Sequence, residues 1–124
     1  MNKMMKETEN NANGIFNICL NYGGRIEIVE ATKKICTDVL NNKISIDDIT
    51  EECYNKYLFN DLEPIDLMIR TSGEYRLSNF MLWQMAYSEL YFTNTLWPDF
   101  DEKEFDNALD VYNNRERRFG GIKK

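Results

Sequence analysis

Two arginines and a serine lie close together in the middle of the chain: Arg70, Arg76 and Ser78. Arg70 follows a short apolar run, residues 65–69, that is typical of a buried strand, and a Thr-Ser-Gly turn comes directly after it. Ligands bind at the carboxyl ends of strands in an open parallel sheet. Guanidinium groups placed there offer planar, bidentate donors to phosphate oxygens. We therefore expect a phosphate or diphosphate clamp on this loop.

Charged residues further along the chain could take part in the same chemistry. A diphosphate carries several negative charges, and Glu89 is the carboxylate best placed in sequence to share a divalent cation with it. Each residue also has a plainer interpretation. Arg70 could pair with a nearby carboxylate, and Glu89 could be solvated at a helix end. Arg115, Arg117 and Arg118 could simply complement a helix dipole.

The elements that position these residues alternate between strand and helix patterns, which predicts an α/β fold with a partial, open, mostly parallel sheet flanked by helices. The Gly23-Gly24 pair follows the first strand and either cradles a phosphate or makes a plain structural turn. Phe80, Trp83 and Tyr87 share one predicted helix face and are expected in the core. The expected elements are strands over 15–22, 65–69 and 90–92 and helices over 25–40, from Ser45 to Tyr57 or Leu58, 79–88 and 102–118. Capping-box-like pairs, Ser45 with Asp48 and Asp101 with Glu104, mark the starts of the second and the last of these helices.

Composition narrows the function classes. The chain has 124 residues, which allows one domain at most, and its formal net charge of −6 is unfavourable for non-specific nucleic-acid binding. It contains no histidine, which excludes a Ser-His-Asp triad, a Cys-His pair and a histidine metal site. The carboxylates that remain favour a hard cation such as Mg²⁺.

Cysteine usage and hydropathy indicate the compartment. Cys19, Cys36 and Cys53 are widely spaced, so we expect free thiols in a reducing environment and small side chains that fill the core. No apolar run approaches a membrane span of about 18 residues. Residues 1–13 are polar and are expected to be frayed or disordered, and residues 14–124 to form the folded part. We expect a cytoplasmic protein that could contact the membrane peripherally.

Four stretches together resemble the cis-prenyltransferases, and in particular the undecaprenyl diphosphate synthase type. They are Asp-Leu-Met-Ile-Arg-Thr-Ser-Gly-Glu-Tyr-Arg-Leu-Ser-Asn-Phe and the residues that follow it to 84, Tyr-Ser-Glu-Leu-Tyr-Phe at 87–92, Trp-Pro-Asp-Phe at 97–100 and Asn-Arg-Glu-Arg-Arg-Phe-Gly-Gly at 114–121. Asn-Tyr-Gly-Gly-Arg at 21–25 matches a further block of the family. The resemblance covers residues 15–121, nearly the whole chain.

The resemblance implies a Mg²⁺-dependent transferase that adds isopentenyl diphosphate units to an allylic diphosphate, such as farnesyl diphosphate, with cis geometry at each new double bond. In the family, residues matching Arg70, Arg76 and Ser78 hold isopentenyl diphosphate, with the position of Leu77 between them. The residue matching Glu89 helps to bind Mg²⁺. The matches to Arg118 and Gly120 reach the diphosphate region near a dimer interface. A homodimer or a partner subunit, and peripheral membrane contact through the lipid product, are expected on the same grounds.

One family feature is missing from the sequence. Family members are about twice this length. Their amino-terminal half carries an Asp-Gly-Asn-Gly-Arg loop that binds Mg²⁺ and the allylic diphosphate, and no such run occurs here. We therefore expect the carboxy-terminal part of such a domain, starting at an internal methionine or arising from a split or truncated gene. The expected catalytic residues lie outside this chain, and no turnover is expected from it alone. The alternative is a non-catalytic accessory or dimerisation subunit.

Overall fold

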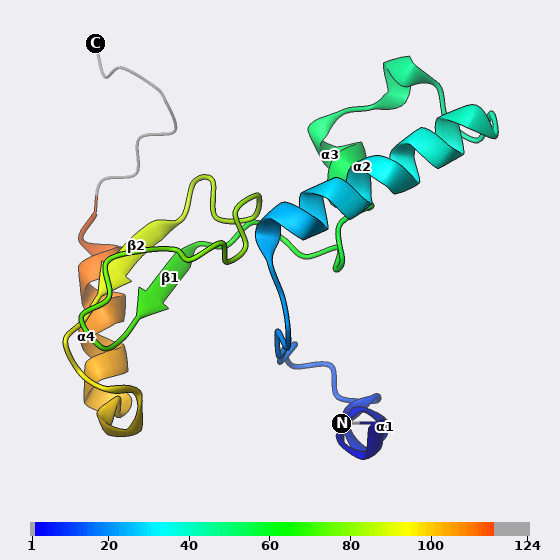
Figure 1. Cartoon of the computed structure of the whole chain (residues 1–124). Coiled ribbons are helices and arrows are strands. Elements are labelled where there is room, and N and C mark those ends of the chain that lie inside the picture. The colour runs from blue at the N-terminus through cyan, green and yellow to red at the C-terminus, as the bar shows by residue number, and fades with distance from the viewer. Residues whose placement is uncertain (1, 116–124) are drawn as a thin grey trace, which may run out of the picture.

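The computed structural model describes residues 2–115 of the chain. Its elements, in order, are α1 (Asn2–Thr8), α2 (Gly24–Leu40), the 3₁₀ turn η1 (Ile46–Asp48), α3 (Glu51–Asn55), β1 (Leu67–Arg70), β2 (Glu89–Phe92), the 3₁₀ turn η2 (Trp97–Asp99) and α4 (Glu102–Asn113). Figure 1 shows α4 beside the strands, α2 with α3 on the opposite side, and α1 at the end of an extended segment. None of the residues of α1 is buried, so α1 contributes no core.

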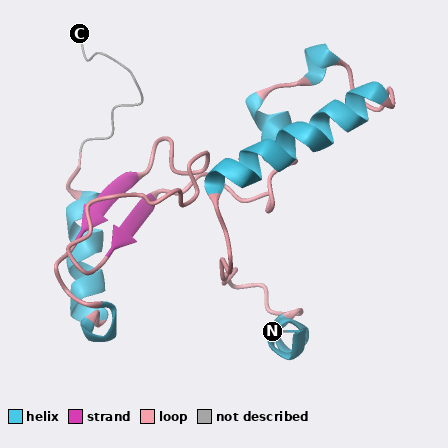
Figure 2. Ribbon diagram, in the orientation of Figure 1, coloured by secondary structure: helices cyan, strands magenta, loops and turns pink. Residues whose placement is uncertain are grey.

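The sheet is a parallel pair of short strands, and it confirms the α/β class predicted from the alternating patterns (Figure 2). Leu67 is in register with Glu89, and Arg70 is in register with Phe92. α4 packs against β2, and its Ala108 is fully buried. The side chain of Asp101 caps α4 by accepting a hydrogen bond from the backbone N–H of Glu104 at 2.9 Å, as the sequence pattern predicted.

The segment after α2 forms two short elements, where the sequence predicted one helix. The predicted cap is present, because the backbone N–H of Ser45 donates to the Asp48 carboxylate at 2.8 Å in a capping box. Ile49 and Thr50 are extended, however, and the Thr50 hydroxyl accepts from the backbone N–H of Cys53 at 3.1 Å. This second cap starts a new helix, α3, because the threonine side chain competes with the backbone for hydrogen bonds.

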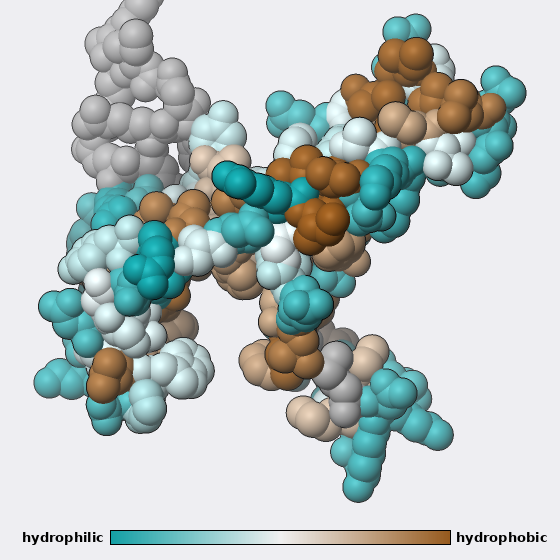
Figure 3. Space-filling model, in the orientation of Figure 1, coloured by the Kyte–Doolittle hydropathy of each residue, from teal (hydrophilic) through white to brown (hydrophobic). Residues whose placement is uncertain are grey.

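Two predicted elements are absent from the described part of the chain. Residues 15–22 were expected to form a strand, but they form none and are largely exposed, with Ile15 84% and Phe16 86% accessible. A strand that is apolar on both faces needs neighbours and covering helices, and β1 and β2 are the only strands among residues 2–115. Figure 3 shows the resulting brown surface on the segment that leads from α1 to α2.

The predicted helix over 79–88 is replaced by a series of turns. Ser78, Asn79 and Met81 have φ values of 49°, 64° and 41°, which a right-handed helix does not accommodate. The side chains buried there are consequently Met81, Gln84 and Met85, which differ from the predicted aromatic stripe. Of that stripe, Phe80 is 41% and Tyr87 76% exposed, and Trp83 is half-buried.

The core beneath the strands is small. Met68, Met81 and Met85 form its buried centre, and partly buried side chains pack around it: Tyr22, Leu62, Ile65, Leu77, Leu90 and Phe92. The three cysteines are free thiols, as predicted, but the expectation that they fill the core is wrong: Cys36 is exposed, and Cys19 and Cys53 are half-buried. Within residues 2–115, no helix is long and apolar enough to cross a membrane.

Candidate functional site

The structure brings the three predicted clamp residues together on the loop that follows β1. Arg70 is the last residue of the strand, and its Nη1 donates hydrogen bonds to the backbone carbonyl of Arg76 and to the hydroxyl of Ser78, the latter at 3.3 Å. The guanidinium of Arg70 thus closes the loop on itself. The Arg70 guanidinium and the Ser78 hydroxyl thus meet at the carboxyl end of a parallel strand, where the sequence predicted an anion site, and Arg76 is joined to Arg70 through its backbone carbonyl.

Arg76 makes an ion pair within the same loop. Its guanidinium contacts the carboxylate of Glu74, and the side chains are 62% and 40% exposed. An exposed pair of this kind contributes little to stability because water screens it. A doubly or triply charged anion can therefore take the place of Glu74 at a small energetic cost. Leu77, between Arg76 and Ser78, is half-buried and packs on the methionine core.

A small hollow of about 190 Å³ lies behind the clamp. Both arginines line it together with an apolar set: Met68, Ile69, Leu77, Phe80 and Met85. The lining thus combines two positively charged side chains with methionine, isoleucine, leucine and aromatic carbon. It suits a ligand with an anionic head and a short apolar group.

Glu89 is not beside the clamp. It is the first residue of β2 and lies in register with Leu67, whereas Arg70 lies at the other end of the strand pair. Three residues of strand correspond to about 10 Å. The Glu89 carboxylate instead forms an ion pair with Arg115 at 2.7 Å. Within residues 2–115, no three His, Cys, Asp or Glu side chains are grouped so that they could hold a metal ion.

The Gly23-Gly24 pair has a structural role in the described fold. The backbone N–H of Gly24 donates to the carbonyl of Asn79 at 2.7 Å, and that of Arg25 donates to the Asn79 side chain at 2.9 Å. A Cβ on Gly24 would lie 3.0 Å from Leu82 and 3.2 Å from the Asn79 carbonyl. Asn79 therefore occupies these donors at the amino end of α2, and the interpretation as a plain structural turn is favoured over a phosphate cradle.

Sequence reasoning missed a buried carboxylate at Glu27, which is only 2% exposed. It accepts hydrogen bonds from the Tyr22 hydroxyl, from the backbone N–H of Phe59 at 3.1 Å and from Gln84 Nε2 at 3.1 Å. Burial, together with the carboxylate of Glu27, raises the pKa of the Tyr22 hydroxyl well above its usual value of 10. The signal was present in the helical spacing, because Glu27 lies one turn before Ala31 on the buried face of α2.

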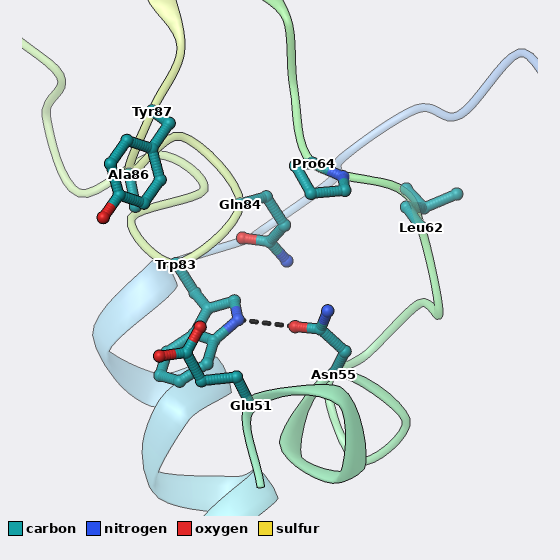
Figure 4. Close-up of a pocket in the computed structure, with 8 residues that line it drawn as sticks. All are labelled: Glu51, Asn55, Leu62, Pro64, Trp83, Gln84, Ala86 and Tyr87. Carbon is teal, nitrogen blue, oxygen red and sulfur yellow. Dashed lines mark hydrogen bonds between the residues drawn. The ribbon is translucent and has the colours of Figure 1, made fainter. Parts of the chain in front are cut away.

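A larger pocket of about 310 Å³ lies near α3 (Figure 4). There the indole N–H of Trp83 donates to the side-chain oxygen of Asn55 at 2.5 Å, and Pro64 and Leu62 close the opposite wall. None of the predicted site residues lines this pocket. The pocket lies near the start of β1, whereas Arg70 is at its carboxyl end. Because ligands bind at the carboxyl ends of parallel strands, we assign the candidate ligand site to the loop after β1.

Two site residues implied by the family resemblance, Arg118 and Gly120, lie outside the described residues, and so do Arg117 and the end of the predicted last helix. α4 ends at Asn113, with Asn114 as its C-cap, so the helix that the sequence predicted over 102–118 is shorter than expected. The structure therefore gives no position for the predicted Arg-Phe-Gly element.

The described fold defines an α/β protein in which two arginines line a hollow at the carboxyl end of a parallel strand. Comparison with known proteins identifies one family. The family model described as putative undecaprenyl diphosphate synthase matches residues 1–120. The chain therefore belongs to the undecaprenyl diphosphate synthase family of prenyltransferases, which confirms the family predicted from its motifs.

Individual relatives agree with this assignment. An isoprenyl transferase from Fusobacterium nucleatum is 58% identical over 121 residues, which cover 98% of this chain and 50% of that protein. A ditrans,polycis-undecaprenyl-diphosphate synthase from Buchnera aphidicola, named as specific for (2E,6E)-farnesyl diphosphate, is 55% identical over 118 residues, covering 94% of this chain and 47% of that protein. The chain thus spans about half the length of these relatives.

Solved structures show the same relationship. Lavandulyl diphosphate synthase from Lavandula x intermedia, crystallised with dimethylallyl diphosphate, superposes with a TM-score of 0.91 at 39% identity. The superposition covers 97% of this chain and 52% of that one. The fold described here therefore corresponds to about half of a prenyltransferase domain, as the sequence motifs predicted.

Proposed function

We propose that this chain carries the isopentenyl diphosphate clamp of a cis-prenyltransferase. The whole activity would be the Mg²⁺-dependent cis condensation of isopentenyl diphosphate with an allylic diphosphate, giving a polyprenyl diphosphate. The observation that carries the proposal is that Arg70 contacts both Arg76 and Ser78 on one loop at the end of β1, and that both arginines line the same hollow. The hollow behind the clamp supports it, because its apolar wall suits a short isopentenyl group.

The nature of the reaction explains why such a clamp is needed. In the condensation the allylic diphosphate departs, whereas the diphosphate of isopentenyl diphosphate stays attached. Guanidinium groups on this loop would therefore bind and orient isopentenyl diphosphate through charge-assisted hydrogen bonds, so that its double bond lies beside the allylic carbon. Farnesyl diphosphate is the expected allylic partner, because a relative that is 55% identical is named as specific for it. The loop supplies donors for one diphosphate, and the groups that hold the allylic substrate are expected outside residues 1–124.

In the proposed reaction, Mg²⁺ would bind together with the diphosphate substrate. The Glu89 carboxylate would supply one oxygen, in competition with its ion pair to Arg115, which engages Oε2. The other ligands would come from the diphosphate and from residues outside this chain. We infer that the isolated chain does not turn over, because it spans half of its relatives and contains no Asp-Gly-Asn-Gly-Arg loop.

The test separates binding from turnover. Calorimetric titration of the full chain with isopentenyl diphosphate and with inorganic pyrophosphate should give binding in both cases, whereas isopentenol, which has no charged head, should give none. Labelled isopentenyl diphosphate, farnesyl diphosphate and Mg²⁺ should yield no polyprenyl product. Product formed by the pure chain would disprove the inactivity, and failure of both diphosphates to bind would disprove the clamp.

A second candidate function is that of an accessory or dimerisation subunit. It is favoured by the exposed apolar segment before α2, in which Ile15, Phe16 and Leu20 are 84%, 86% and 66% accessible. Apolar surface of this kind commonly marks an interface. Size-exclusion chromatography of the chain, alone and mixed with a full-length relative, tests this role. Self-association or co-elution with the relative is expected. A chain that elutes as a monomer in both experiments would exclude the accessory role.

A further inference from the structure

The loop that carries the clamp is tied to the segment that follows β2. The backbone N–H of Ser72 donates to the carbonyl of Thr95 at 2.8 Å, and that of Gly73 donates to the carbonyl of Thr93 at 2.9 Å. These bonds lie beyond the last paired residues of the two strands, Arg70 and Phe92, and join the clamp loop to the segment after β2. Gly73 has a φ of +66°, and a Cβ there would lie 2.9 Å from the Asn94 side chain, so the close approach requires glycine.

The segment after β2 is in turn held by Glu104, in the first turn of α4. The hydroxyl of Thr95 donates to Glu104 Oε2 at 3.0 Å. The Thr93 hydroxyl lies 3.1 Å from Thr95 Oγ1 and 3.3 Å from the same carboxylate oxygen, and it accepts from the backbone N–H of Thr95 at 3.2 Å. The single proton of each hydroxyl thus has an acceptor, and the chain of hydrogen bonds ends on a carboxylate.

The three groups are half-buried, which makes the network a fixed one. A half-buried carboxylate accepts stronger hydrogen bonds from hydroxyl groups than an exposed carboxylate does, because water competes less for its oxygens. Asp101 caps α4 at the backbone N–H of Glu104 itself, at 2.9 Å. Glu104 is therefore fixed in place at the helix end closest to the threonines.

We propose that Glu104 is a positioning residue for the diphosphate clamp. It would not contact the ligand. It holds Thr93 and Thr95, whose carbonyls hold the turn at Ser72 and Gly73, and this turn separates Arg70 from Arg76 and Ser78. Without Glu104, the turn would move and Arg70 would lose its contacts with Arg76 and Ser78. The inference rests on the proposed function of the loop, and it adds a residue on α4 to that site.

The test uses the full chain and three substitutions. Glu104→Ala removes the acceptor, Glu104→Gln keeps an oxygen acceptor, and Asp106→Ala removes an exposed carboxylate from the same helix as a matched control. Calorimetry with inorganic pyrophosphate and with isopentenyl diphosphate measures the affinity. We expect Glu104→Ala to bind each about tenfold more weakly, and the other two variants to stay within about twofold of the original chain.

Amide hydrogen exchange tests the positioning step independently of any ligand. Glu104→Ala should speed exchange at Ser72 and Gly73 while leaving the α2 amides at Ala31 and Ile35 unchanged, and Glu104→Gln should restore slow exchange. Unchanged exchange at Ser72 and Gly73 would overturn the positioning role. If exchange changes as expected but the original chain binds neither diphosphate, the proposed function fails and the structural link stands. Equal affinity in Glu104→Ala and the original chain would overturn the inference.

Discussion

The side-chain oxygen of Asn79 accepts a hydrogen bond from the backbone N–H of Arg25 at 2.9 Å, although 54 residues separate the two in sequence. Asn79 directly follows the clamp residue Ser78, and Arg25 is the second residue of α2. The far end of the clamp loop is therefore attached to a helix N-terminus, where the free N–H groups need acceptors. The close approach explains why two glycines precede Arg25.

Replacing Asn79 with glycine should lower the free energy of unfolding by about 1 kcal/mol, because α2 loses its side-chain cap. Glycine isolates the cap, since Asn79 has a φ of 64° that glycine adopts without strain. Urea denaturation followed by circular dichroism measures the change. Asn79→Asp keeps an acceptor and adds a favourable charge at the helix N-terminus, so it should be as stable as the original. Equal loss in both variants would contradict the capping role.

The sequence predicted the parts of the fold that local signals control. The strand before Arg70, the helix after Gly23 and the caps at Ser45 and Asp101 are all present, because each depends on residues within one or two turns. The predicted strand at 15–22 and the predicted helix at 79–88 are absent. The strand depends on neighbours that residues 2–115 do not supply, and positive φ values interrupt the helix.

In the candidate site, too, only the features that depend on nearby residues were predictable. Arg70, Arg76 and Ser78 come together because they belong to one short loop. The position of Glu89 was not predictable, because it depends on the register of β2 against β1. The role of Glu104 was hidden for a similar reason. Its capping pattern predicted a hydrogen bond to the helix backbone, whereas its carboxylate accepts hydrogen bonds from two threonine hydroxyls on another segment.

Tyr22→Phe should destabilise the protein by about 1–3 kcal/mol, because the buried carboxylate of Glu27 loses a hydroxyl donor. The change keeps the aromatic ring, so the edge contacts with Phe59 and Phe80 remain. Chemical denaturation at pH 7 measures it. Tyr75→Phe serves as the control, since Tyr75 is 69% exposed, and it should change stability by less than about 0.5 kcal/mol. Equal effects of the two substitutions would contradict a structural role for the Tyr22 hydroxyl.

The stability of the folded chain should also fall in alkali through Tyr22. Its pKa is raised in the folded protein, chiefly by burial and then by Glu27, so the folded state keeps a proton that the unfolded state releases near pH 10. The contribution is complete below pH 10 and is lost as the pH rises above that value. The free energy of unfolding, measured from pH 8 to about 11, should fall more steeply for the original chain than for Tyr22→Phe. Parallel slopes would show that Tyr22 does not titrate differently on folding.

Arg70→Ala should weaken the binding of isopentenyl diphosphate strongly. Two charge-assisted hydrogen bonds of about 1.5–3 kcal/mol each are at stake, which together correspond to about a hundredfold loss of affinity or more. Arg70→Lys keeps the charge but not the fork geometry, so we expect an intermediate loss. Calorimetry measures the three affinities, and circular dichroism checks the fold. Unchanged affinity in Arg70→Ala would remove Arg70 from the site.

The ion pair between Glu89 and Arg115 makes a separate prediction about Mg²⁺. If Glu89 becomes a ligand when the ion arrives with a diphosphate, Glu89→Gln should abolish the increase in diphosphate affinity that Mg²⁺ produces. Arg115→Ala frees the carboxylate and should make that increase larger. Stability should change by less than about 1 kcal/mol in both, because the Arg115 side chain is 44% exposed. Titrations with and without Mg²⁺ measure the effect, and an undiminished increase in Glu89→Gln would exclude Glu89 as a ligand.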